Sequence, residues 1–315
     1  MKILHYSLVI LLLLVSACSS EAPVIPTKVG TNVWPGYEPL YLARANERLD
    51  PEAVQLVEYP SSSEVIRSFR NGSLDAAALT LDEVLLLLQS EIPVKVVLVM
   101  DISEGGDAIL ARPEISSFNE LRGKRIAVEG NALGAYVISR ALELNQMSLD
   151  DVQIKNIEVS AHLEAYSKNR VDAVVTFDPV RTSLLNQGAN EIFTSREIPG
   201  EIVDVLVVHE EYLRNNPARI RHIVQAWFET LNFMENQKEE AMQIIAKRLF
   251  ITAEEVEASY HGLILPGLDK NRQLLTGATP AMGTTLQRLE QTMLANDLLM
   301  RDLDTTRLLS GEMLE

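Results

Sequence analysis

Leu74-Asp-Ala-Ala-Ala-Leu-Thr-Leu-Asp-Glu-Val84 has a close counterpart later in the chain, Val171-Asp-Ala-Val-Val-Thr-Phe-Asp-Pro-Val180. In each stretch Asp-Ala begins a short apolar run, Thr-x-Asp-x-Val ends it, and leucines follow. Such a run predicts a buried strand, and the following leucines predict a helix. Strand-turn-helix units precede both copies in the same order, as expected of an internal duplication. The sequence therefore predicts two lobes that are built alike and face each other.

The segments around the two copies alternate between strand and helix patterns. Around the first copy, strands are predicted at 29–33, 54–59, 74–79 and 94–100, and helices at 38–49, 64–71 and 82–89. Around the second, a strand is predicted at 125–129 and a helix at 135–143. This alternation is typical of a doubly wound α/β fold with parallel sheets.

The end of the chain is helical. After a last buried strand at 201–208, Pro217 begins a long amphipathic pattern, and further helix patterns cover 239–248, 254–262 and 282–299. This part has no strand to begin a third lobe, so we expect it to pack on the first lobe. We therefore predict lobe 1 at 27–108 and again at 207–315, lobe 2 at 109–206, and crossings near 108–112 and 204–208. Two lobes joined by two crossings form a hinge, which can close on a ligand.

The N-terminus has the features of an export signal. Lys2 precedes an apolar run from Leu8 to Val15, which is too short for a spanning helix of about 20 residues. Val15-Ser-Ala-Cys18 contains the only cysteine and resembles the lipobox of bacterial lipoproteins, whose cysteine becomes the acylated first residue. The resemblance implies a signal peptide at 1–17, a tether at 18–26, and a lipid anchor at Cys18 that holds the protein in the periplasm or at the cell surface.

The composition excludes some partners. The chain carries 28 basic and 44 acidic residues, a net charge of −16, which repels nucleic acid. A single cysteine allows no intramolecular disulfide, so a core drawn from the 47% of apolar residues must hold the fold. We expect a monomer without a cofactor.

Reacting groups for catalysis are few. His162, His209, His222 and His261 show no metal-ligand spacing, and we interpret them as structural. The sequence contains neither a Gly-x-Ser-x-Gly elbow nor a Walker-type loop, and the glycines of Gly130-x-x-x-Gly134 are wrongly spaced for a dinucleotide fingerprint. We therefore predict no catalytic residue and no metal site.

Polar and aromatic residues follow several predicted strands, where open α/β sheets bind their ligands. They are Asn32, Trp34, Gly36, Tyr37, Ser61, Ser62, Ser63, Thr80 and Asp82 in the first lobe, Glu129, Asn131, Gly134, Tyr136, Phe177 and Asp178 in the second, and Asp204 at the return crossing. The serines and Asp82 could instead cap helices and do nothing more. Capping does not require Trp34 or Tyr37, whose exposure without a partner is costly. We therefore predict a ligand site at which Trp34→Ala weakens binding more than it lowers stability.

Four stretches of the chain resemble the sequences of one protein family. They are Val29-Gly-Thr-Asn-Val-Trp-Pro-Gly-Tyr-Glu-Pro-Leu-Tyr-Leu-Ala43, Gly105-Gly-Asp-Ala-Ile109, Leu121-Arg-Gly-Lys-Arg-Ile-Ala-Val128 and Thr176-Phe-Asp-Pro-Val-Arg181. Together they resemble the solute-binding proteins of ABC importers in the nitrate, sulfonate, taurine and thiamine-precursor group. The resemblance implies a type II periplasmic binding protein, a venus flytrap that closes on a small molecule and delivers it to a membrane permease. It also implies that the helix starts at Ser63 and Gly134 accept an anionic head group.

The carboxylates of the predicted cleft depart from this pattern. Asp82, Glu129, Asp178 and Asp204 crowd the site, and buried carboxylates favour cations. We therefore expect a ligand that carries an amine or another cationic group. Two other functions stay open: a sensor that passes a signal to a membrane protein, and an enzyme related to those that act on thiamine pyrimidine precursors.

Overall fold

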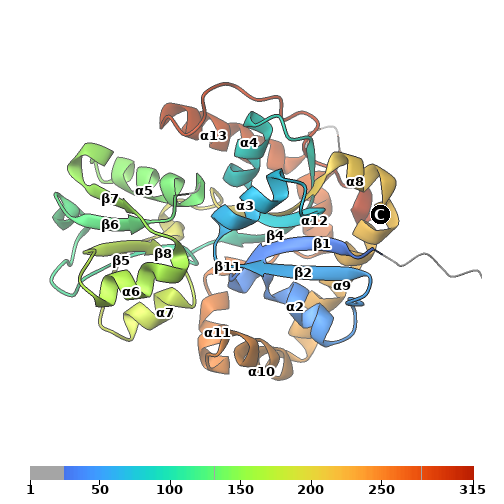
Figure 1. Ribbon diagram of the computed structural model, residues 1–315, viewed down its shortest axis with the longest axis horizontal. Helices are drawn as coiled ribbons and strands as arrows, with labels where there is room; N and C mark the ends of the chain where they lie inside the picture. The colour runs from blue at the N-terminus through green and yellow to red at the C-terminus, as the bar shows by residue number, and fades with distance from the viewer. Residues whose placement is uncertain (1–24, 131, 278) are drawn as a thin grey trace, which may run out of the picture.

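The protein consists of two α/β lobes, each built around its own sheet (Figure 1). The computed structural model describes residues 25–130, 132–277 and 279–315. The expected signal peptide, Cys18 and Asn131 lie outside these residues, so our inferences about them stay predictions. None of the helices in the described part combines the length and the apolar character that a membrane span requires.

The first sheet has six strands in the order β2-β1-β3-β10-β4-β11. They are β1 (Thr27–Asn32), β2 (Val54–Tyr59), β3 (Ala76–Thr80), β4 (Val94–Ser103), β10 (Val203–His209) and β11 (Leu263–Ile264). β1 pairs in parallel with β2 and β3, whereas β10 runs antiparallel to both β3 and β4. β3 is buried along its whole length, which explains its unbroken apolar sequence.

The second sheet repeats this arrangement with five strands in the order β7-β6-β8-β5-β9. They are β5 (Ala108–Ala111), β6 (Arg125–Val128), β7 (Gln153–Asn156), β8 (Ala173–Thr176) and β9 (Asn190–Thr194). β6 pairs in parallel with β7 and β8, and β5 runs antiparallel to both β8 and β9. The strand that arrives from the other lobe, β10 in one sheet and β5 in the other, thus has the same place in both. The repeated motif falls on β3 and β8, which confirms the predicted duplication.

The expectation of purely parallel sheets was wrong, because each lobe receives a strand from the other. Such a strand enters its sheet from the side at which the parallel strands end, so it must run against them. The chain passes between the sheets at residues 104–107 and 195–202. Residues 108–111 and 204–208, near which we expected the crossings, therefore already belong to β5 and β10.

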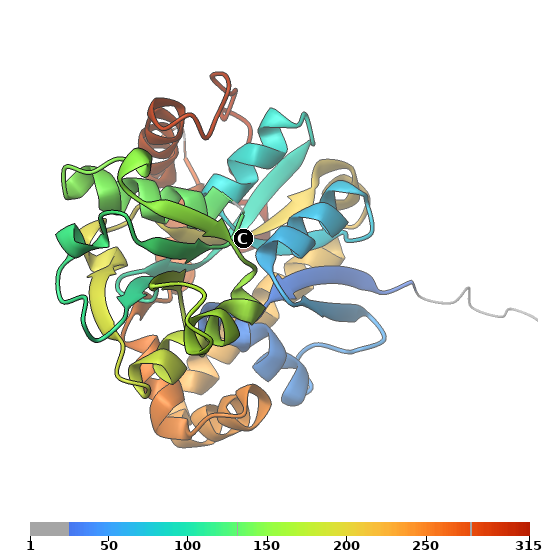
Figure 2. The ribbon, with the colours of Figure 1, turned by 60° about the vertical axis from the view of Figure 1, so that its left-hand side comes forward.

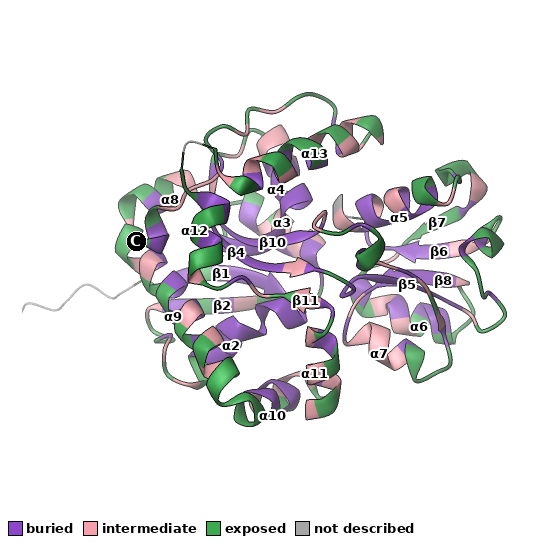
Figure 3. Ribbon diagram, turned by 180° about the vertical axis from the view of Figure 1, so that it is seen from behind, coloured by how far each residue is buried: buried purple, intermediate pink, exposed green. Residues whose placement is uncertain are grey.

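Helices cover both faces of each sheet (Figures 1 and 2). Those of the first lobe are α2 (Glu38–Ala45), α3 (Ser62–Arg70), α4 (Leu81–Gln89), α8 (Glu210–Asn215), α9 (Pro217–Asn236), α10 (Lys238–Leu249), α11 (Ala253–Tyr260), α12 (Leu268–Leu275) and α13 (Ala281–Ala295). Those of the second lobe are α5 (Ala132–Leu144), α6 (His162–Ser167) and α7 (Val180–Leu185). Figure 3 shows that the central strands are buried and that the outward helix faces are exposed.

The C-terminal helices pack on the first lobe, as predicted. α9 lies against α2, and α10 contacts both. From α10, Arg248 donates through Nε to Glu38 Oε2 at 2.7 Å and through Nη1 to Glu58 Oε2 at 2.7 Å. Because Glu38 is buried, removal of Arg248 would leave an uncompensated charge in the interior. The ion pair therefore fixes the position of the helical tail on this lobe.

Candidate functional site

Two small, adjoining pockets lie between the lobes, at the carboxyl ends of β1, β3, β6 and β8. The first pocket is lined by Asn32, Trp34, Tyr37, Ser62, Thr80, Glu83, Asp107, Leu133, Phe177 and Asp204. The second pocket is lined by Asp107, Glu129, Leu133, Gly134, Val137, Val159, His162, Val175, Thr176 and Phe177. Both pockets draw on Asp107, Leu133 and Phe177, so they adjoin, and each has a volume of about 20 Å³.

The structure brings most of the residues predicted for the site to these pockets. Asn32, Trp34, Tyr37, Ser62, Thr80, Glu129, Gly134, Phe177 and Asp204 line one of them. Gly36, Ser61, Ser63, Asp82, Tyr136 and Asp178 do not line either pocket. Tyr136, for example, donates to Glu201 Oε2 at 2.5 Å, and Ser61 accepts from the backbone N–H of Glu64, which caps α3.

The turn that follows β1 holds a pair of carboxyl groups. Trp34 Nε1 donates to Asp101 Oδ2 at 3.0 Å, and the hydroxyl of Tyr37 donates to Asp204 Oδ1. Gly36 lies between the two aromatic residues, and a Cβ added there would lie 1.9 Å from Asp101 Oδ2. Only glycine therefore allows the backbone to pass this close to the carboxyl pair. The aromatic residues at this turn orient carboxyl groups as well as line the first pocket.

Asp101 and Asp204 face each other on neighbouring antiparallel strands, β4 and β10. The two residues are 0% and 2% exposed, and a side-chain hydrogen bond joins the two carboxyl groups, which requires one of them to keep a proton. Burial raises the pKa of Asp101 to about 7 and raises the pKa of Asp204 well above its usual range. Two opposed carboxyl groups cannot both ionise readily in a buried site. The pair therefore retains a proton near neutral pH unless a cation replaces it.

Three further buried acids lie in the same region, since Glu83 and Asp107 act on Asp204 and Asp82 acts on Glu83. Burial is the main cause that raises the pKa of Asp82 to about 7, of Glu83 to about 8 and of Asp107 to about 6. No lysine or arginine is among the residues that line either pocket. Within the part of the chain that the structure describes, no group of three or more His, Cys, Asp or Glu side chains has the arrangement of a metal site. The pockets are therefore lined by acidic groups and by neither lysine nor arginine, although the nearby Arg181 guanidinium lowers the pKa of Asp107.

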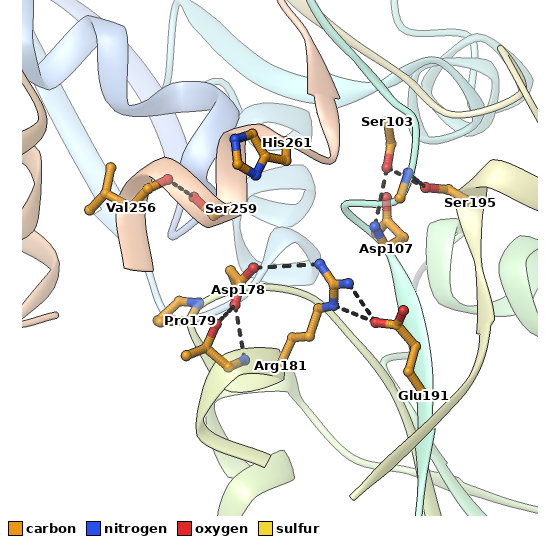
Figure 4. Close-up of polar contacts among 12 residues, drawn as sticks. Ser103, Asp107, Asp178, Pro179, Arg181, Glu191, Ser195, Val256, Ser259 and His261 are labelled. Carbon is orange, nitrogen blue, oxygen red and sulfur yellow. Dashed lines mark hydrogen bonds and ion pairs between the residues drawn. The ribbon is translucent and has the colours of Figure 1, made fainter. Parts of the chain in front are cut away.

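Hydrogen bonds at the two crossings position Asp107 (Figure 4). Ser103 Oγ accepts from the backbone N–H of Asp107 at 3.2 Å and lies 2.8 Å from Ser195 Oγ. Asp178 instead accepts from the backbone N–H and the hydroxyl of Thr182, at 2.9 and 2.6 Å, which caps α7. Its Oδ2 lies 3.8 Å from Arg181, whose Nε donates to Glu191 at 2.7 Å. Asp178 thus has its own partners in the second lobe.

Glu129 joins the two lobes. It follows β6 of the second lobe, and its Oε1 accepts from Ser62 Oγ at 3.2 Å, Ser63 N at 3.1 Å and Ser63 Oγ at 3.0 Å in the first lobe. These donors belong to the start of α3, where a helix favours a negative charge. The helix start that we expected to receive an anionic head group is thus bound to a carboxylate of the protein itself.

Glu129→Ala is expected to shift the ligand-free protein toward a more open arrangement of the lobes. The substitution removes three hydrogen bonds between the lobes, and loss of bonds to a buried charged group costs about 1–3 kcal/mol. Small-angle X-ray scattering should show a larger radius of gyration, while Glu158→Ala, at an exposed site of the same lobe, should leave it unchanged. Identical scattering from both variants would contradict a closing role for Glu129.

The buried carboxyl groups should make the ligand-free protein less stable as pH rises. Folded Asp82 and Asp101, with pKa values of about 7, bind protons more tightly than the unfolded chain does. The resulting stability is fully present below the unfolded pKa of about 4 and is lost as pH rises through about 7. Each pKa unit is worth about 1.4 kcal/mol, so we expect the melting temperature to fall by several degrees between about pH 5 and about pH 8.

Calorimetric melting curves across this pH range would measure the effect. Asp101→Asn should make the melting temperature depend less on pH, because asparagine does not titrate. A wild-type melting temperature that rises steadily over the same range would show that these carboxyl groups have ordinary pKa values.

Comparison with known proteins identifies the family to which the chain is similar. A model of the NMT1-like family matches residues 20–250. The taurine-binding periplasmic protein of Escherichia coli (strain K12) is 22% identical over 191 residues, which are 58% of this chain and 59% of that protein. The chain therefore spans less than two thirds of that relative's length.

Solved structures share the fold at low sequence identity. The alkanesulfonate-binding protein of Xanthomonas axonopodis pv. citri, solved with MOPS bound, is 15% identical and has a TM-score of 0.76, covering 93% of this chain and 98% of its own. The desulfurization enzyme DSZB is 16% identical with a TM-score of 0.65, covering 91% of this chain and 97% of its own. A periplasmic-binding-protein fold thus serves binding proteins and an enzyme, so fold alone does not decide between these functions.

The family match extends over the structural features that define the site. Residues 20–250 include all strands of both sheets except β11, and every residue that lines the two pockets. The repeat, the two crossings and the cleft between the lobes all lie within this range. This chain belongs to the NMT1-like family.

Proposed function

We propose that the protein is an extracytoplasmic solute-binding lipoprotein that closes on a small cationic molecule, such as a protonated amine, and delivers it to an ABC permease. The observation that carries the proposal is the set of buried carboxyl groups in a cleft whose lining includes no lysine or arginine. Asp107 Oδ2 has no hydrogen-bond partner among the described residues, and Asp204, which lines the first pocket, shares a proton with Asp101 that a cation could replace. An ammonium group supplies both the donors and the positive charge that such oxygens require.

Anionic ligands are less well suited to this cleft. A sulfonate would meet the acidic groups of the first pocket, and the start of α3 is already bound to Glu129. Repulsion between like charges in a buried site is costly. The relative that binds taurine is informative here, because taurine carries an amino group as well as a sulfonate.

The location of the protein follows from the same proposal. Relatives include a periplasmic binding protein, and the lipobox-like segment ending at Cys18 supports a lipid anchor on the outer side of a membrane. A tethered receptor of this kind could present its ligand directly to a permease in the same membrane. The named relatives that bind solutes support a binding role over catalysis.

A thermal-shift experiment on the chain from Ser19 onward tests the ligand class. Butylamine, taurine and methanesulfonate are compared at matched ionic strength and about pH 7.5, where the carboxyl pair is available to a cation. A ligand present at 100 times its dissociation constant should add about 2.7 kcal/mol to stability. Stabilisation by butylamine supports the proposal. Stabilisation by methanesulfonate alone would overturn it.

A further inference from the structure

The second pocket contains a histidine that is set up to accept a hydrogen bond. His162 begins α6, is 1% exposed, and places Nε2 2.9 Å from the carbonyl oxygen of Ile157. A carbonyl oxygen can only accept, so Nε2 carries the proton and Nδ1 is left as an acceptor. Burial lowers the pKa of His162 to about 4, which keeps the ring neutral. Nδ1 has no hydrogen-bond partner among the described residues.

Two other polar atoms of the second pocket lack a partner in the described part of the chain. They are Thr176 Oγ1 and Asp107 Oδ2, and both residues are buried. The neighbouring side chains Val137, Val159 and Val175 are apolar and supply no donor. The Thr176 hydroxyl can donate as well as accept, whereas His162 Nδ1 and an ionised Asp107 can only accept. A buried acceptor without a donor costs about 1–3 kcal/mol, so these two groups favour a ligand group that carries N–H or O–H.

The region where the two pockets meet is apolar. Leu133 and Phe177 line both pockets, and Phe177 also packs edge-on against Trp34 with ring centres 5.1 Å apart. A ligand that lies in both pockets would therefore have apolar side chains at its middle. At one end it would meet Asp204 and Glu83, and at the other end His162 and Thr176. Asp107 borders both ends.

We propose that the ligand is a short linear diamine, with one amino group in the first pocket beside Asp204 and the other in the second pocket beside His162 Nδ1. This inference rests on the cationic ligand class proposed above and names its chemistry. A methylene chain between the amino groups fits against Leu133 and Phe177, where burial of each CH₂ contributes about 0.8 kcal/mol. An amine with an acidic group at its far end would instead place that group against acceptors.

Isothermal titration calorimetry with putrescine, butylamine and taurine tests the inference. Putrescine and butylamine have the same carbon chain and differ only in the second amino group. We expect putrescine to bind the wild-type protein about tenfold or more tightly than butylamine, because only putrescine satisfies the acceptors of the second pocket.

Two substitutions test whether the second pocket causes the difference in affinity between putrescine and butylamine. In His162→Leu, the preference for putrescine over butylamine should be lost, because the second amino group no longer has the Nδ1 acceptor. Thr176→Val, which keeps the shape of its side chain, should reduce the preference for putrescine in the same direction. It also provides an independent test if His162→Leu fails to fold.

The outcomes separate this inference from the proposed function. Equal affinities for putrescine and butylamine would overturn the diamine and leave the amine-binding function intact. Taurine binding more tightly than butylamine would also overturn the diamine, because the second pocket would then accept an anionic group. Failure of both amines to bind, with methanesulfonate bound, would overturn the proposed function itself.

Discussion

Asp204→Asn is expected to weaken amine binding by at least about 100-fold, which corresponds to a loss of about 3 kcal/mol or more. The carboxyl group of Asp204 lines the first pocket, is buried and is paired with the carboxyl group of Asp101. A buried ammonium group that loses its counter-charge loses much more than one at a surface. Asparagine keeps an oxygen that can accept from Tyr37, so the turn should retain its shape.

The same substitution should stabilise the ligand-free protein at about pH 8. It removes one of two opposed buried acids, and with it the cost of ionising the pair. Calorimetry of binding and of unfolding on one preparation measures both effects. Asp150→Asn is the matched control, because Asp150 is exposed on the second lobe and should change neither quantity. Undiminished amine affinity in Asp204→Asn would show that the carboxyl pair does not bind the ligand.

Trp34→Ala is expected to lower the free energy of unfolding by about 3–5 kcal/mol as well as weaken binding. Trp34 is only 5% exposed, it packs on Phe177 across the cleft, and it donates to Asp101. The substitution leaves a cavity and removes the donor of a buried carboxyl group. This changes the expectation from sequence that binding would suffer much more than stability. The structure assigns Trp34 to the core and to the pocket at once.

Trp34→Phe separates the two roles. Phenylalanine keeps an aromatic ring against Phe177 but has no N–H for Asp101, so we expect a loss of about 1–3 kcal/mol. Denaturant unfolding of both variants gives the stability changes, and titration with butylamine gives the binding changes. Equal stability of wild type and Trp34→Ala would show that Trp34 is not part of the core.

Much of the fold could be predicted because it depends on patterns that are local in sequence. The repeated motif predicted strands at the places of β3 and β8, and an apolar run predicted β2 with its observed bounds. The antiparallel position of β10 could not be predicted in the same way, because it depends on pairing between segments far apart in the chain. The two-residue strand β11 is too short to leave a periodic signal.

The site could be predicted less completely. Trp34 and Tyr37 were found because they follow a predicted strand, and Asp204 because it lies at the predicted return crossing, and all three line the first pocket. Asp101, Asp107 and Glu83 were missed, since a single acid beside an apolar run is usually at the surface. His162 was interpreted as structural, because sequence does not show that one ring nitrogen is satisfied by a carbonyl oxygen and the other is not.

The place of β10 also sets an order in which the two lobes can be completed. All strands of the second sheet lie within residues 108–194, so this sheet can form as soon as that continuous segment is available. In the first sheet, β4 lies between β10 and β11 and also bridges to Leu309 through Val96, and all three of these segments come after the entire second lobe in the chain. A chain that emerges from its N-terminus therefore carries β4 as an unpaired apolar strand until residues 203–209 arrive. The first lobe therefore begins earlier in the chain than the second lobe, but its sheet can be completed only after the sheet of the second lobe.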